Sequence, residues 1–210
     1  MSIEVQPAPP VAPDAPAASP ARTSRGWWWA MLVASLLGIA SGTITVVEKI
    51  ALLAEPGRSA ICDVNGAIGC TPVLLAPQSS VLGPPNAALG IVMFGMLAAA
   101  GLAGVMGTAF PRSYRWFLLG LSTFFGLFLT WYMWQVGFVI GSLCPFCAVC
   151  AGSVMVTTLA AWRTATVDVP HSTHGLGGAL AAARRSGLDV IVIVGWSLLI
   201  AGVLVVGIAL

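Results

Sequence analysis

Long apolar stretches separated by shorter polar segments dominate the chain after its first 25 residues. Five of these stretches have about the twenty residues that a helix needs to cross the hydrocarbon core of a bilayer. They run from about Trp27 to Val47, Ala87 to Phe110, Trp116 to Ile140, Leu143 to Trp162 and Leu188 to Leu210. The pattern predicts an all-α integral membrane protein, with a four-helix transmembrane bundle and a fifth, C-terminal transmembrane helix.

The composition agrees with this pattern. Hydrophobic residues make up 58% of the 210 residues and charged residues only 8%, whereas a soluble domain carries about 25% charged residues. These few charges are not enough to form a water-facing surface. The lipid bilayer must therefore cover much of the surface of this protein. The net charge of +2 is too small to suggest a nucleic-acid partner.

The few positive charges predict the orientation, because cytoplasmic loops carry an excess of Lys and Arg. With the N-terminus in the cytoplasm, only Lys49 and Arg58 lie outside, and the opposite topology inverts this bias. The seven residues placed inside are Arg22, Arg25, Arg112, Arg115, Arg163, Arg184 and Arg185. We therefore expect a cytoplasmic N-terminus and an extracytoplasmic C-terminus.

This orientation divides the chain into four parts. Residues 1–25, rich in Pro, Ala and Ser, are expected to be a disordered cytoplasmic tail. Residues 26–162 form the predicted four-helix bundle and include one long extracytoplasmic loop, 54–85. Residues 163–187 are expected to be a cytoplasmic loop, and residues 188–210 the fifth helix.

A C-x-x-C motif, Cys144-Pro145-Phe146-Cys147, opens the fourth predicted helix. Pro145 suits the first helical position, so Cys144 is expected at the N-cap. A helix N-terminus lowers a thiol pKa, and the thiolate is the species that attacks disulfides. Cys147 lies one turn deeper, close enough to pair with Cys144. The motif therefore predicts a redox-active pair.

Two further cysteines, Cys62 and Cys70, lie in the long outer loop, on the side where the fourth helix begins. Four cysteines at one membrane face, bordering an oxidising compartment, favour redox chemistry over a purely structural role. Cys150, two turns into the helix, is expected to be a buried, unreactive thiol. Zinc binding is the weaker alternative, since the Cys62–Cys70 spacing is wider than zinc pairs usually show, and we predict no metal site.

The adjacent charges Glu48 and Lys49 end the first apolar stretch. Charges near a bilayer are costly unless they reach the interface or find a partner. Interfacial anchoring is the simpler interpretation, and proton supply or docking of the outer loop is the alternative.

These residues resemble the vitamin K epoxide reductase family in its bacterial form, from about Trp27 to Trp162. The resemblance rests on Glu48-Lys49, on the segment from Cys62 to Cys70 (CDVNGAIGC), on Pro77 to Gly83 (PQSSVLG), on Asn86 to Gly90 (NAALG), and on Cys144 to Cys147. It implies a four-helix bundle around a quinone of the menaquinone or ubiquinone type, in a bacterial cytoplasmic membrane. Because the chain stops at Leu210, we expect the thioredoxin-like partner to be a separate protein.

The resemblance also implies roles for individual residues. Cys62 would exchange with the reduced thiols of a thioredoxin-like thiol oxidase, Cys70 would pass electrons to Cys144, and Cys147 would reduce the quinone. Asn86 matches an asparagine that hydrogen-bonds a quinone carbonyl, although it is equally suited to cap the second helix. Aromatic residues near the outer ends of the third and fourth helices could wall the quinone site: Trp131, Tyr132, Trp134, Phe138 and Phe146.

Two positions depart from the family pattern. Ala76 replaces a common serine, with Ser79 and Ser80 nearby, and Ala151 replaces a tyrosine of vertebrate members. These departures argue against epoxide reduction and are compatible with simple quinone reduction. We therefore predict a membrane thiol–disulfide oxidoreductase that supports disulfide bond formation. The alternatives are a disulfide-stabilised scaffold without catalysis and a reductase that moves electrons outward.

Overall fold

The computed structural model describes residues 25–209, which fold into helices without any named strand. The predicted all-α membrane architecture is confirmed, because five helices are long and apolar enough to cross a membrane. The elements are α1 (Arg25–Ala54), α2 (Thr71–Leu75), the 3-10 turn η1 (Pro77–Ser80), α3 (Asn86–Val105), α4 (Arg112–Gln135), the π-helical turn η2 (Val136–Ile140), α5 (Pro145–Ala165), α6 (Leu176–Ser186) and α7 (Leu188–Ala209).

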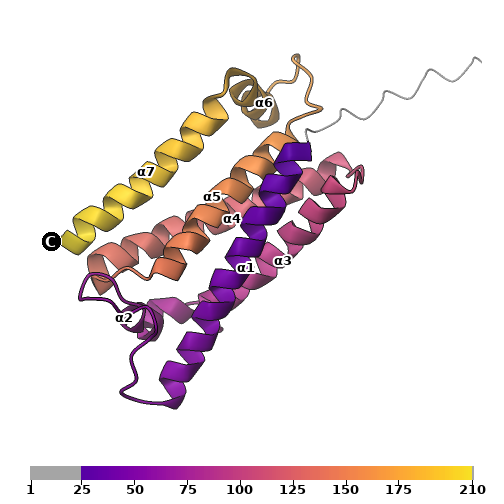
Figure 1. Cartoon of the computed structure of the whole chain (residues 1–210). Helices are drawn as coiled ribbons and strands as arrows, with labels where there is room; N and C mark the ends of the chain where they lie inside the picture. Colours follow the sequence, from indigo (N-terminus) through magenta and orange to yellow (C-terminus); the bar gives the residue numbers. More distant parts are fainter. Residues whose placement is uncertain (1–24, 210) are drawn as a thin grey trace, which may run out of the picture.

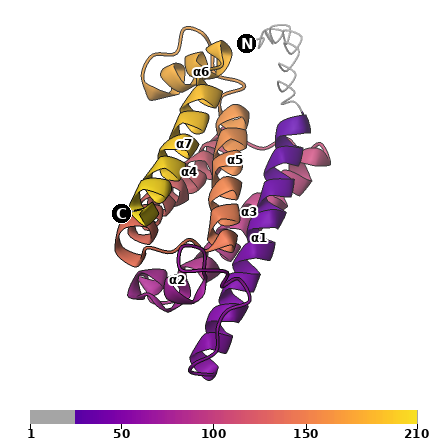
Figure 2. The ribbon, with the colours of Figure 1, turned by 60° about the vertical axis from the view of Figure 1, so that its left-hand side comes forward.

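Helix α1 links α3 and α5 in the bundle. It packs along α3 on one side and along α5 on another, and α5 in turn packs against α4. Helix α7 lies against α4, α5 and η2, on the side away from α1 and α3 (Figures 1 and 2). The structure therefore consists of four closely packed helices with a fifth added at one side.

Glycine lets α1 and α3 approach closely. A Cβ on Gly101 would lie 2.9 Å from the backbone nitrogen of Leu32, and one on Gly38 would lie 2.4 Å from the ring of Phe94. Small residues at such positions are typical of packed membrane helices, because van der Waals contact rather than hydrophobic burial drives their association.

The two ends of the bundle carry different short elements. Helix α6 lies at the end where α1 begins, whereas α2 and η1 lie at the opposite end (Figures 1 and 2). Most of the tail predicted for residues 1–25 lies outside the described residues, and Arg25 already belongs to α1.

The helix bounds differ from the sequence expectation in three places. Helix α1 continues to Ala54, about two turns past the predicted end, because Glu48 and Lys49 find partners on the outer loop. Helix α3 ends five residues early, at Val105, before Gly107 with its φ of 95°. The segment expected to be a simple loop, 163–187, contains the amphipathic helix α6.

Candidate active site

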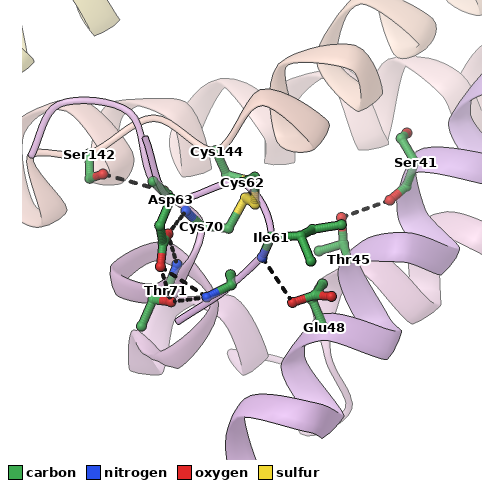
Figure 3. The surroundings of a disulfide bond; sticks show 12 residues. Ser41, Thr45, Glu48, Ile61, Cys62, Asp63, Cys70, Thr71, Ser142 and Cys144 are labelled. Atoms are coloured by element: carbon green, nitrogen blue, oxygen red, sulfur yellow. Dashed lines mark hydrogen bonds between the residues drawn. A yellow bond between two sulfur atoms is a disulfide. The ribbon is translucent and has the colours of Figure 1, made fainter. Parts of the chain in front are cut away.

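A disulfide joins Cys62 and Cys70 in the loop between α1 and α2, with their Cα atoms 5.7 Å apart (Figure 3). Both residues are buried, and Cys70 is the N-cap residue of α2. The short α2 begins there because Pro72 sits in its first turn, where the missing N–H costs nothing. The loop therefore holds an oxidised cysteine pair against the α2 end of the bundle.

The carboxylate of Asp63 organises this loop. It accepts hydrogen bonds from the backbone N–H groups of Ala60, Cys70 and Thr71, and from the Thr71 hydroxyl (Figure 3). Desolvation of the carboxylate opposes its ionisation, but the bonds from Thr71, Cys70 and Ala60 outweigh it and hold the pKa of Asp63 below its usual value. This network fixes both ends of the disulfide loop around a single charge.

A short backbone pairing brings the loop to the start of α5. The N–H of Gly69 donates to the carbonyl of Leu143 (3.1 Å), and the N–H of Leu143 donates to that of Ala67 (2.8 Å). The Sγ atoms of Cys70 and Cys144 consequently lie 3.0 Å apart. The convergence of the loop and helix cysteines, which the sequence suggested through topology, is present in the structure.

Cys144 is the N-cap residue of α5 and Pro145 its first residue, as predicted. A hydrogen bond from the Cys147 thiol lowers the pKa of Cys144, while burial raises it. The backbone N–H groups of Cys147 and Phe146 lower it further, so the net shift is downward. Cys144, Cys147 and Cys150 are free thiols. Cys144 is thus suited to act as an attacking or departing thiolate.

Cys147 opens onto a cavity between α1, α3, α4 and α5, whose empty space, including its open part, is ≈ 770 Å³. Its walls are mostly apolar, with polar groups from Thr45, Lys49, Ser79 and Asn86. Aromatic rings line it as well: Phe94, Phe125, Phe128 and Tyr132. An apolar cavity with a few convergent polar groups is typical of a small-molecule site.

The structure separates the residues that the sequence suggested for this cavity. Asn86 lines it, and Trp131 instead lines a different hollow, with Leu199 and Val203 of α7. Phe146 lies in the first turn of α5 and is not among the cavity-lining residues. Quinone contact by these residues stays a prediction.

The sequence analysis missed Phe94, Phe125 and Phe128 as cavity residues, because apolar helices give no sequence signal for the face that meets a cavity.

Asn86 does not cap α3, because Pro85 takes the N-cap position and Asn86 is the first helical residue. Its Nδ2 donates to the backbone carbonyl of Gln78 (2.7 Å). Its Oδ1 is buried without a hydrogen-bond partner. A buried polar atom usually has a partner, so this oxygen suits a polar group in the cavity.

The Cys150 side chain also lines the cavity and is partly exposed, rather than sealed in the core as expected. Its Sγ lies 3.0 Å from the Ser41 hydroxyl of α1. The sulfur atoms of Cys62, Cys70 and Cys144 lie within 4.8 Å of one another. Since two of them form a disulfide, they do not supply the thiolates that zinc requires.

Glu48 and Lys49 are both buried and both contact the loop between α1 and α3, as the docking alternative would require. Glu48 pairs with Arg58 and accepts a hydrogen bond from the N–H of Ile61, beside Cys62 (Figure 3). Lys49 donates to the hydroxyls of Ser79 and Ser80.

Comparison with known protein families gives a match. The model of the vitamin K epoxide reductase family matches residues 29–163, more than half of the chain. None of the curated proteins compared matches it. The matched region holds all five cysteines and the cavity. The chain therefore belongs to the vitamin K epoxide reductase family, and it is a multi-pass membrane thiol–disulfide oxidoreductase.

Proposed function

We propose that this protein oxidises an extracytoplasmic thioredoxin-like thiol oxidase and passes the electrons to a membrane quinone of the menaquinone or ubiquinone type. The observation that carries the proposal is a continuous path of sulfur atoms. It runs from the Cys62–Cys70 disulfide across 3.0 Å to Cys144, and ends at Cys147 on the cavity wall.

The first step is thiol–disulfide exchange at the loop. A partner thiolate attacks Cys62, expels Cys70 as a thiolate, and the partner's second thiol then releases the oxidised partner. Cys62 is only 8% exposed, so the loop must shift for this attack. The neighbouring side chains of Ile61 and Val64 are exposed and apolar, and they offer the partner a docking surface.

The second step moves the electrons inward. The Cys70 thiolate attacks Cys144 of a Cys144–Cys147 disulfide and expels Cys147. Cys62 then attacks Cys70, restores the loop disulfide and expels Cys144. A leaving thiol of lower pKa departs faster, so the lowered pKa of Cys144 favours this release.

The third step is reduction of the quinone in the cavity. Cys144 and Cys147 together give up two electrons and two protons as their disulfide forms, and the quinone takes up both to become a hydroquinone. Asn86 offers its free Oδ1 to a hydroquinone O–H, and the second hydrogen of its Nδ2 to a quinone carbonyl. The apolar walls suit the ring and its hydrocarbon tail.

The experiment is quinone reduction by purified protein in detergent, with a reduced thioredoxin-like thiol oxidase as electron donor. Cys147→Ser should abolish turnover, and Cys150→Ser, the same change one turn along the same helix, should retain it. Absence of turnover with either quinone type, with the disulfide intact, would instead support a structural scaffold.

A trapping experiment tests the partner. A partner whose second active-site cysteine is replaced by serine should accumulate a mixed disulfide with Cys62 of the native loop. Its single thiolate attacks Cys62 and expels Cys70, and no second partner thiol remains to release it. Trapping through Cys144 with none through Cys62 would contradict the proposed order.

We also propose that the chain resides in a bacterial cytoplasmic membrane, with its N-terminus inside and its C-terminus outside. Among residues 25–209, Lys and Arg at the α2 end are limited to Lys49 and Arg58, whereas the α6 end carries Arg25, Arg112, Arg115, Arg163, Arg184 and Arg185. Val64 (73% exposed) and Leu176 (74%) lie at opposite ends. In a cysteine-free background and intact cells, an impermeant maleimide should label Val64→Cys and not Leu176→Cys.

A further inference from the structure

Lys49 is an ammonium group buried inside a membrane-spanning helix without a carboxylate partner. Its residue is 9% exposed, and it lies within the α1 span. Over residues 25–209 three ion pairs occur, and none includes Lys49. The adjacent Glu48 is directed instead to Arg58, 3.5 Å away. A charge kept in a membrane at such cost points to a function.

The hydrogen bonds of Lys49 leave one donor free. Its Nζ lies 2.6 Å from each of the hydroxyl oxygens of Ser79 and Ser80. Ser79 directs its own hydroxyl hydrogen to the carbonyls of Leu74 and Ala76, so it accepts from Lys49. An ammonium has three N–H donors, and the third has no acceptor among the described residues.

That free donor belongs to a side chain that lines the cavity. Lys49 and Ser79 share the cavity wall with Asn86, whose Oδ1 is unpartnered, and with Cys147. The other titratable groups that face this space are Tyr132 of α4 and Cys150 of α5. No carboxylate lines the cavity. Among the described residues that line the cavity, Lys49 is therefore the one cationic proton donor.

We propose that Lys49 is a catalytic residue that donates a hydrogen bond, and then a proton, to one oxygen of the quinone as that oxygen gains electrons. The inference rests on the proposed quinone reduction. A positioned donor at an oxygen that becomes negative stabilises the transition state more than the ground state.

The reaction remains balanced with Lys49 in this role. Formation of the Cys144–Cys147 disulfide releases two electrons and two protons. Lys49 gives its proton to the quinone oxygen and takes up one of the protons released by the thiols. The second proton reaches the other oxygen, so one hydroquinone forms per disulfide and Lys49 ends the turnover as it began.

The test uses prereduced full-length protein mixed with quinone in detergent, with the first turnover followed at varied quinone concentration and pH. Lys49→Met should lower the maximal rate about 100-fold, in the range that general acids supply, with little change in the quinone concentration for half-maximal rate. Lys49→Arg keeps the charge and the donors but holds its proton, so it should lose about tenfold.

The pH profile separates proton donation from structural support. The native rate should fall at alkaline pH as Lys49 loses its proton, and this alkaline limb should be absent in Lys49→Met. Exchange of Cys62 with the partner and the thermal midpoint should remain near native values in both variants. Ser80→Ala, which removes one neutral contact of Lys49, is the matched control and should stay within about threefold of native.

Three results would overturn the inference. The first is a Lys49→Met rate within about threefold of native, and the second is full activity of Lys49→Arg. The third is a parallel loss of quinone reduction and Cys62 exchange, which would show that Lys49 only holds the loop. Failure of the native protein to reduce any quinone would overturn the proposed function itself, and this inference with it.

Discussion

The two ends of the bundle bury charge in opposite ways. At the α6 end, Arg163 pairs with Asp189 through Nη2 and Oδ1 at 2.9 Å, and Arg115 pairs with Asp168. At the α2 end, Lys49 lines the cavity and donates to two neutral hydroxyls, and its third N–H has no acceptor among the described residues. A charge paired with its opposite serves stability, whereas a charge without one is free to serve a substrate.

The α6 end is built from contacts between helices that are distant in sequence. Arg163 of α5 also stacks over the ring of Trp27 in α1, with its guanidinium carbon 4.6 Å from the ring centroid. Asp189 is completely buried at the start of α7. This cluster therefore joins α1, α5 and α7, and it explains how the fifth helix is held on the other four membrane helices.

The largest expected effect is on chemistry at the α2 end. Cys144→Ser should abolish electron transfer from the loop to the quinone, because a serine hydroxyl cannot form the disulfide that carries the electrons. The thermal midpoint should change little, since serine is of similar size. Turnover is measured with the partner as donor, and any activity within tenfold of native would contradict the sulfur path.

The largest expected effect on stability lies at the α6 end. Asp189→Asn leaves the partly exposed Arg163 without its carboxylate partner, which should cost less than the about 3–5 kcal/mol of breaking a fully buried pair. The free energy of unfolding in detergent should fall accordingly, and α7 should become more accessible to protease. Quinone reduction at a temperature where the variant remains folded should stay near the native rate. A loss of quinone reduction with unchanged stability would contradict the proposed difference between the two ends.

A smaller and pH-dependent effect is expected for Asp63→Asn. The pKa of Asp63 is lowered in the folded protein, so its carboxylate stabilises the fold above the unfolded pKa of about 3.9. That contribution disappears as the pH falls through the still lower folded pKa. Because Asp63 is exposed, solvent weakens the effect, and the variant should lose at most about 1 kcal/mol at pH 7. The difference in thermal midpoint between native and variant protein should narrow below about pH 4.

Glu55→Gln is the control for this change, since Glu55 is an exposed carboxylate near the same loop and forms no ion pair among the described residues. The thermal midpoints of native and Asp63→Asn protein could also differ by the same amount at acidic and neutral pH. That result would show that the carboxylate charge does not hold the loop.

The smallest expected effect distinguishes two aromatic residues on α4. Phe128 lines the cavity, whereas Trp131 lines the hollow beside α7. Phe128→Leu should raise the quinone KM several-fold, since each lost ring contact is worth about 1 kcal/mol. Trp131→Leu should leave KM within about twofold. A larger increase in KM for Trp131→Leu than for Phe128→Leu would instead support the contact between Trp131 and the quinone that the sequence suggested.

The sequence by itself determined the membrane architecture and the position of the helix cysteines. Both depend on local free energies: an apolar run of sufficient length favours a spanning helix, and Pro145 fixes the first turn of α5 directly after Cys144. The predicted end of α1 was wrong because Glu48 and Lys49 were expected to end the helix at the bilayer surface. The free-energy cost of burying these charges is offset by partners later in the chain.

Only the tertiary structure decided which side chains meet in the cavity. A membrane helix is apolar on every side, so its sequence does not distinguish the faces that meet lipid, another helix or a ligand. Packing between helices places Phe128 rather than Trp131 at the cavity. It also brings Lys49 to Ser79 and leaves the Oδ1 of Asn86 without a partner. The same packing leaves Lys49 a free donor, because the adjacent carboxylate, Glu48, is held by Arg58 and the loop.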